Sequence, residues 1–156
     1  MIHKIRLKVS SGKGGRGCLS FASSRRKVRG GPDGGDGGRG GDVWIEVNNQ
    51  KSSLSHLNKN KIYKAEDGRP GKSRRQTGRK GKNLIIEVPP HTWLKTKNLE
   101  ILIGEDAPYL LIKGGRGGRG NNYFKNSINQ APNKVGVFGK SQSLEIDLQI
   151  KKKNTI

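Results

Sequence analysis

The chain has 156 residues, with 32 Lys or Arg against 12 Asp or Glu, so its formal net charge is +20. Cys18 is the only cysteine, which excludes an intrachain disulfide, and no apolar stretch approaches the roughly 18 residues of a membrane span. The excess of positive charge indicates a polyanionic partner. A basic surface that serves only solubility is the less favoured alternative.

The first predicted strand covers residues 2–9, where Ile5, Leu7 and Val9 alternate with basic or polar residues. Further strands are predicted at residues 18–21, 43–47, 61–65, 83–88, 99–103, 109–112 and 144–150. The only helix candidate is a single turn within residues 51–58, because two leucines there are three positions apart. Seven or eight short strands with turn residues between them predict a mainly β fold, a small β-barrel with almost no α-helix.

Residues 30–42 contain eight glycines, and from Gly34 the sequence repeats as Gly-Gly-X. Three residues per turn is the period of the polyproline II helix, and its bare glycine faces let other backbones approach closely. Related runs occur at residues 12–17 and 114–120. A flexible linker is the alternative interpretation of these runs. A linker, however, would not require Asp and Arg residues at every third position.

We therefore expect a bundle of polyproline-II-type glycine helices, built from segments 10–42 and 113–122, packed beside the barrel. Its structural residues are Gly31, Pro32, Asp33, Gly34, Gly35, Asp36, Gly37, Gly38, Arg39, Gly114, Gly115, Arg116, Gly117 and Gly118.

Four arginines, Arg16, Arg39, Arg116 and Arg119, lie inside the glycine runs. They are interpreted as ion-pair or hydrogen-bond partners between glycine helices, with the aspartates of residues 33–42 as acceptors. RNA binding of the Arg-Gly-Gly type is the competing interpretation.

Other basic residues gather in two clusters that fall between predicted strands. Lys and Arg contacts to phosphates supply affinity for RNA without reading its sequence, and Arg also stacks on unpaired bases. The predicted RNA-binding residues are Arg25, Arg26, Lys27, Arg29, Lys72, Arg74, Arg75, Arg79, Lys80 and Lys82, with Lys134 and Lys140 as additions from a later loop.

No enzymatic site is predicted. His3, His56 and His91 are scattered without metal-ligand spacing, and no nucleophile elbow is present, so neither a metal nor a cofactor is expected. Residues 71–73 and 139–141 both read Gly-Lys-Ser, the end of a P-loop, but each lacks the first glycine of that motif.

The glycine-proline-aspartate run from Gly30 and the runs at residues 113–118, 124–127 and 129–132 resemble the N-terminal domain of the Obg GTPases. The resemblance extends to about residue 150. It implies a β-barrel carrying a bundle of left-handed type II glycine helices, as one domain over residues 1–150, with a basic tail at 151–156.

The resemblance also implies a function. The Obg domain docks on the large ribosomal subunit, with its barrel-tip loops towards the peptidyl-transferase centre. Basic positions of the family that face rRNA match Arg25, Arg29, Arg74, Arg79 and Lys80.

The sequence departs from the family in two ways. The family's P-loop GTPase domain does not follow, so a stand-alone Obg domain is expected, either natural or a truncated piece. Residues 129–133 also lack both arginines of the family's Asn-Arg-x-Pro-Arg pattern, for which Lys134 and Lys140 are the candidate replacements.

The predicted role is assembly of the large subunit, or inhibition of subunit joining and translation. The alternatives are an interaction module that partners or competes with a full-length Obg GTPase, and a permanent component of a ribosome, including an organellar one. The expected partners are large-subunit rRNA and, beside it, ribosomal proteins or other assembly factors. A monomer without membrane association is expected in the bacterial cytoplasm, or in an organellar matrix if a transit peptide has been removed.

Overall fold

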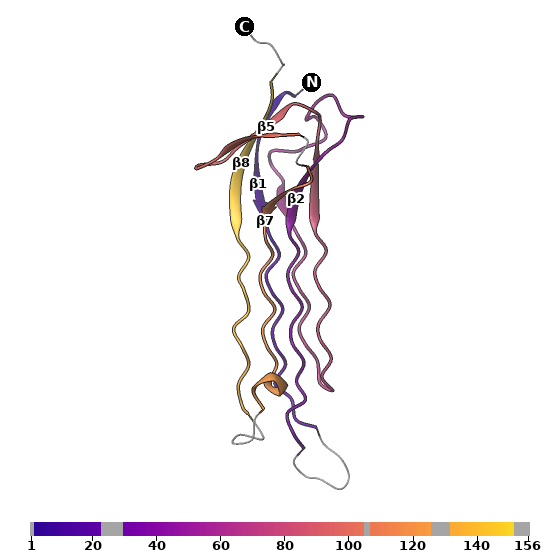
Figure 1. Ribbon diagram of the computed structural model, residues 1–156, viewed down its shortest axis with the longest axis vertical. Coiled ribbons are helices and arrows are strands. Elements are labelled where there is room, and N and C mark those ends of the chain that lie inside the picture. Colours follow the sequence, from indigo (N-terminus) through magenta and orange to yellow (C-terminus); the bar gives the residue numbers. More distant parts are fainter. Residues whose placement is uncertain (1, 23–29, 105–106, 126–131, 152–156) are drawn as a thin grey trace.

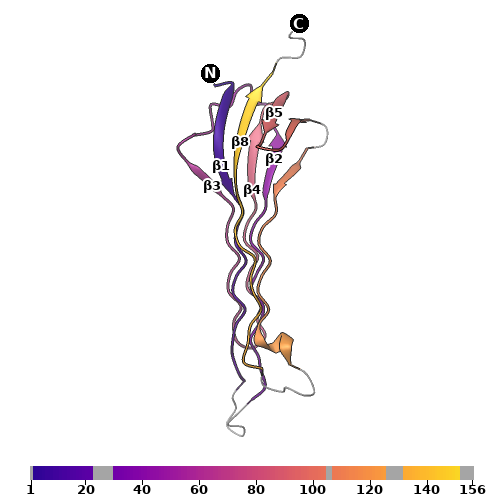
Figure 2. The same ribbon diagram turned by 90° about the vertical axis from the view of Figure 1, so that its left-hand side faces the viewer.

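The structure is a computed structural model that describes residues 2–22, 30–104, 107–125 and 132–151. Within these ranges the chain forms eight β-strands and one short 3-10 helix, η1 (Asn121–Phe124), which confirms the mainly β fold. The strands gather at one end of an elongated molecule. Long extended segments run from them towards the other end (Figure 1 and Figure 2).

The strands form two sheets that share one hydrophobic core. The five-stranded sheet has the order β3 (Ile62–Lys64), β1 (Lys4–Ser10), β8 (Ser143–Ile150), β5 (Thr92–Lys95), β6 (Glu100–Ile103). The three-stranded sheet has the order β4 (Leu84–Val88), β2 (Val43–Val47), β7 (Tyr109–Ile112). No ladder within the described residues joins the two sheets, so the barrel expected from the sequence is not closed.

Strand β1 has one buried face and one exposed face, as the alternation of its apolar residues predicts. Ile5, Leu7 and Val9 are buried, and the basic residues between them are exposed. Their side chains share the core with buried Ile146 and Leu148 of β8, the antiparallel partner of β1. Burial of each large aliphatic side chain contributes about 1.5–3 kcal/mol, so this strand pair anchors the sheet end of the molecule.

Two predictions of local structure were wrong, and one strand was missed. Residues 18–21 form no strand and make only an isolated bridge between Phe21 and Pro32. Residues 51–58 are irregular turns rather than a helix, although Leu54 and Leu57 are buried as a helical face would bury them. Strand β5 was missed because its four residues follow a proline pair and are too few to show a period.

Six extended segments make up the rest of the described chain, and we number them in chain order. Segment I follows β1, segment II precedes β2, segment III follows β3, segment IV precedes β4, segment V follows β7 and segment VI precedes β8. Their residues are 11–22, 30–42, 66–72, 76–83, 113–120 and 132–142. Segments III, IV and VI were not expected in the glycine layer.

Hydrogen bonds between the segments follow the Gly-Gly-X period. In segment II the amide of Gly37 donates to Gly118 of segment V at 2.8 Å, and the amide of Gly38 donates to Arg69 of segment III at 2.8 Å. The carbonyl of Arg39 accepts from Gly81 of segment IV at 2.8 Å. A polyproline II helix has no internal hydrogen bonds, so neighbouring segments satisfy its backbone groups instead.

The segments lie in two layers of three. Segment I binds segment III through Gly68 N–H to Lys13 O at 2.8 Å, and segment VI through Gly14 N–H to Gly139 O at 2.9 Å. Segment II binds segments IV and V in the same way and therefore centres the second layer. The bond from Gly15 N–H to Gly38 O, 2.8 Å long, joins the two central segments.

The glycines are needed for close approach rather than for an unusual backbone conformation. None of the 24 glycines, all of which the structure describes, has a positive φ. A Cβ on Gly37 would overlap the carbonyl oxygen of Gly15, and a Cβ on Gly117 would overlap that of Gly37. Any side chain at these positions would push the segments apart and break their hydrogen bonds.

Candidate nucleic-acid interface

The turn between segments III and IV carries two exposed arginines in an unusual conformation. Arg74 and Arg75 both have a φ of 60°. This left-handed region favours glycine or asparagine, and other residues there cost of order 1–3 kcal/mol each. The amide of Lys72 donates to the carbonyl of Gln76 at 2.9 Å and closes the turn.

Asp33 of segment II holds this turn in place. Its Oδ2 accepts a hydrogen bond from the Arg74 amide at 3.1 Å, and its carbonyl oxygen accepts one from the Arg75 amide at 2.6 Å. Only main-chain atoms of the two arginines are used in these bonds. Neither guanidinium group makes an ion pair with a described carboxylate, so both remain available to a ligand.

A cavity of about 330 Å³ opens beside the turn. Gly31 and Asp33 of segment II line it, together with Arg74, Arg75 and Lys125. Three cationic side chains therefore surround one hollow at the end of segments III and IV. The arrangement suits a phosphate-bearing ligand.

The other predicted RNA-binding residues of this region are Lys72, Arg79, Lys80 and Lys82, all of them exposed on segments III and IV. A second cavity, of about 740 Å³, lies along the same edge and is lined by Lys72, Arg79 and Arg69, among others. Sequence reasoning did not select Arg69. The predicted cluster is thus an extended basic edge of the bundle rather than a loop at the tip of the barrel.

Lys134 and Lys140 lie on segment VI, which forms an edge of the other side of the bundle. The Lys134 ammonium lies 4.5 Å from the centre of the Phe124 ring, in a cation–π contact. These two lysines therefore do not join the cluster on segments III and IV. The predicted residues Arg25, Arg26, Lys27 and Arg29 lie outside the described residues.

The arginines of the glycine runs divide into two kinds. Arg39 pairs with Asp42 at 3.3 Å, and Arg119 pairs with Asp36 at 2.9 Å. Arg16 and Arg116 are exposed, and no described carboxylate lies within ion-pair distance of either. The ion-pair interpretation therefore applies to the first pair and leaves the second pair free to contact a ligand.

Buried Asn121 ties the segments together near the basic turn. Its Oδ1 accepts from the Gly34 amide at 2.9 Å, and its Nδ2 donates to Ser20 O at 2.9 Å and Pro132 O at 3.3 Å. One side chain thus joins segments I, II and VI. Sequence reasoning missed this residue, although an asparagine directly after a glycine run was a visible signal.

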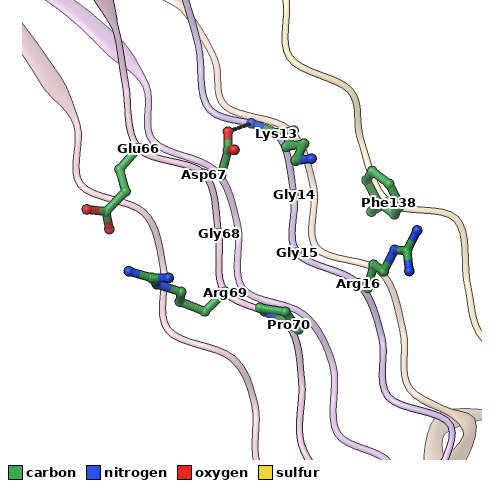
Figure 3. A pocket seen from close by; sticks show the side chains of 10 residues that line it. All are labelled: Lys13, Gly14, Gly15, Arg16, Glu66, Asp67, Gly68, Arg69, Pro70 and Phe138. Carbon is green, nitrogen blue, oxygen red and sulfur yellow. Dashed lines mark hydrogen bonds between the residues drawn. The ribbon is translucent and has the colours of Figure 1, made fainter.

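A groove of about 450 Å³ lies on the layer formed by segments III, I and VI (Figure 3). Gly14 and Gly15 form part of its floor, and Lys13, Arg16 and Phe138 stand around one side. Sequence reasoning considered RNA binding only for Arg16, as the competing interpretation, and for none of the other residues. The signal was the phase of segment I, which turns Lys13 and Arg16 to the same face because they are three residues apart.

Asp67, at the other side of the groove, is engaged by its neighbours. Its Oδ1 accepts the Lys13 amide at 2.9 Å and lies 3.3 Å from the Lys64 ammonium. Partial burial acts to raise the pKa of Asp67, but these hydrogen bonds and the lysine charges outweigh it and lower the pKa. The carboxylate is therefore charged and partnered, and it fixes segment I against segment III.

The two Gly-Lys-Ser sequences lie in the bundle. The amide of Gly71 donates to Arg16 O at 2.8 Å, and the amide of Gly139 donates to Arg116 O at 2.6 Å. A P-loop needs such amides for the phosphates of a nucleotide.

In the described part of the chain, no group of three His, Cys, Asp or Glu side chains could hold a metal ion. Among the same residues, none of the helices has the length and apolar character needed to span a membrane.

Comparison with known proteins gives a consistent result. The model of the GTP1/OBG family matches residues 2–152. The chain is 46% identical to the GTPase Obg of Nautilia profundicola over 154 residues, which cover 96% of this chain and 43% of that protein. It is 42% identical to the GTPase Obg of Bdellovibrio bacteriovorus over 152 residues, with 96% and 44% covered. The chain thus spans less than half the length of these relatives.

Proposed function

This chain belongs to the GTP1/OBG family, and we propose that it binds rRNA of the large ribosomal subunit through the basic end and edge of its glycine bundle. The proposed role is in assembly of that subunit, or in inhibition of subunit joining and translation. If the partner is a bacterial ribosome, the protein acts in the cytoplasm.

The Arg74–Arg75 turn is the observation that carries the proposal. Two arginines occupy positions that favour glycine or asparagine, and Asp33 holds their backbone there. Strain of this kind is retained where a function depends on the conformation. Two guanidinium groups at the end of a rigid bundle can grip phosphates and stack on unpaired bases.

The net charge of +20 supports the same conclusion. Lysine and arginine contacts to phosphates provide affinity and register for RNA, and they make binding depend steeply on salt. Asp36 and Asp42, two of the acidic residues in the bundle, are used internally to pair Arg119 and Arg39. The remaining basic side chains of the bundle therefore present a positive surface to a large polyanion.

The GTPase activity in the name of the relatives is a property of those proteins, and more than half of their length lies outside the match. We assign this chain the binding role, because both of its Gly-Lys-Ser sequences use their glycine amides inside the bundle.

Co-sedimentation with purified large subunits over a series of salt concentrations tests the proposal. The test variant is Arg74→Asn with Arg75→Asn, because asparagine tolerates the left-handed conformation while the charge is removed. The matched control is Lys59→Asn with Lys97→Asn, which removes the same charge from exposed positions near the sheets. We expect saturable binding near one to one, weakened at least tenfold in the test variant and retained in the control.

Other outcomes identify the alternatives. Equal weakening in both variants would mean non-specific attraction and would overturn the proposal. Absence of wild-type binding at moderate salt would favour an interaction module that acts with a protein partner. Stoichiometric presence in mature translating ribosomes would favour a permanent ribosomal component.

A further inference from the structure

The groove on segments III, I and VI has a composition unlike the basic turn. Its floor includes the bare backbone of Gly14 and Gly15, and half-buried Phe138 stands over it from segment VI. Figure 3 shows Lys13 and Arg16 on the same side of the groove as the Phe138 ring. An aromatic ring, glycine backbone and two cations therefore meet in one place.

The two cations are free to act on a ligand. Lys13 and Arg16 are exposed, and neither side chain makes an ion pair with a described carboxylate. The nearby carboxylate of Asp67 is already bound by the Lys13 amide and by Lys64. The side of the groove next to Phe138 is therefore positive.

The period of the bundle fixes this geometry. Lys13 and Arg16 are one polyproline II turn apart, about 9 Å along segment I. Their backbones are held by bonds from Gly68 N–H to Lys13 O and from Gly71 N–H to Arg16 O, each 2.8 Å long. Segment VI is fixed beside them by Gly14 N–H to Gly139 O at 2.9 Å, next to Phe138. The aromatic ring and the cations are thus carried by a hydrogen-bonded lattice.

We propose that this groove binds one unpaired nucleotide, with the base stacked on Phe138 and the phosphate held by Lys13 and Arg16. Stacking on an aromatic ring beside a positive surface is the general way in which proteins hold single-stranded nucleic acid. A volume of about 450 Å³ is within the range of small-ligand sites. The site rests on the proposed RNA-binding function and adds a second, single-strand-selective contact to the basic turn.

The experiment compares a labelled single-stranded RNA of about eight adenosines with an RNA duplex of the same length, by fluorescence anisotropy over a salt series. In Phe138→Leu we expect about tenfold weaker binding of the single strand, with an unchanged salt slope and unchanged duplex affinity. In Lys13→Gln with Arg16→Gln we expect the salt slope for the single strand to fall by about 0.7, since the contact to one phosphate is lost. The control, Val137→Ala, changes an exposed neighbour of Phe138 and should leave all affinities unchanged.

Two results would overturn the proposal. One is unchanged single-strand affinity in Phe138→Leu, and the other is an equal loss for single strand and duplex. Competition by AMP distinguishes the sources of the nucleotide. Displacement of the single-stranded RNA from the wild-type protein by millimolar AMP would assign the site to free nucleotides as well as RNA. Failure of this site leaves large-subunit binding through Arg74 and Arg75 intact, so the two proposals are separable.

Discussion

The amide of Arg74 donates a hydrogen bond of 3.1 Å to the carboxylate of Asp33, 41 positions earlier in the sequence. This bond fixes a strained turn of segments III and IV against segment II. The sequence presents Asp33 as part of a glycine run and Arg74 as part of a basic cluster, and their contact makes the glycine bundle and the proposed RNA contact a single unit.

Removal of the Asp33 carboxylate should loosen that turn. In Asp33→Ala we expect a loss of about 1.5–3 kcal/mol in the free energy of unfolding, the usual range for hydrogen bonds to a charged group. Binding to large subunits should weaken even though the net charge rises by one. Denaturant unfolding and co-sedimentation measure both effects. Tighter binding to subunits in this variant would show that charge alone, and not the shape of the turn, decides affinity.

Close packing of the bundle predicts a large difference between two glycines. Gly37→Ala should destabilise the protein by about 3 kcal/mol or more, because its Cβ would overlap the backbone of Gly15. Gly104→Ala, where no atom lies within 4 Å of the added Cβ, should change stability by less than about 0.5 kcal/mol. Thermal unfolding of both variants is the measurement, and equal stabilities would contradict the packing argument.

Asn121 should be among the most sensitive polar residues. Asn121→Ala removes the hydrogen-bond partner of the buried Gly34 amide and of the Pro132 carbonyl, and it leaves the Ser20 carbonyl with the Asp33 amide alone. We expect a cost of about 2–4 kcal/mol. The matched control is Asn122→Ala, because Asn122 is the half-buried neighbour in η1. A comparison of their denaturant midpoints is sufficient, and a loss in Asn122→Ala as large as in Asn121→Ala would refute the assigned role.

The lowered pKa of Asp67 gives a pH-dependent prediction. The pKa of this carboxyl is lower in the folded protein than in the unfolded protein, where it is near 3.8. The charged carboxylate therefore stabilises the fold fully at pH values above the unfolded pKa, and this stabilisation is lost as the pH falls through the folded pKa. The stability difference between the wild type and Asp67→Asn should therefore be full at neutral pH and shrink below about pH 4. Urea unfolding at several pH values tests this, and a difference that does not vary with pH would rule out the charge as its origin.

The strands were largely predictable, because alternation on a half-buried sheet leaves a clear pattern. β1 and β8 show it best, with Ile5, Leu7 and Val9 facing Ile146 and Leu148 in the core. The supposed helix at residues 51–58 failed because a spacing of three between Leu54 and Leu57 is met equally well by an irregular turn that buries both.

The bundle was only half predictable. Segments II and V have two glycines per turn and were recognised, whereas segments III, IV and VI have one, as in Gly68 with Gly71, Gly78 with Gly81, and Gly136 with Gly139. A single glycine every third residue is enough for a segment that needs only one bare face. For the candidate site, the types of residue were visible in the sequence, but their division between two edges and a groove depends on contacts between distant segments.

The pairing of segment I with segment VI also bears on how the protein is made. Ser11 donates to Gln142 and Gly14 to Gly139, so the earliest segment to leave the ribosome bonds with the last. Such non-local contacts give a high contact order, and domains of that kind fold slowly. We therefore expect the bundle to be completed only after segment VI has been synthesised. Until then, the nascent chain would expose glycine-rich backbone with unpaired amides and carbonyls.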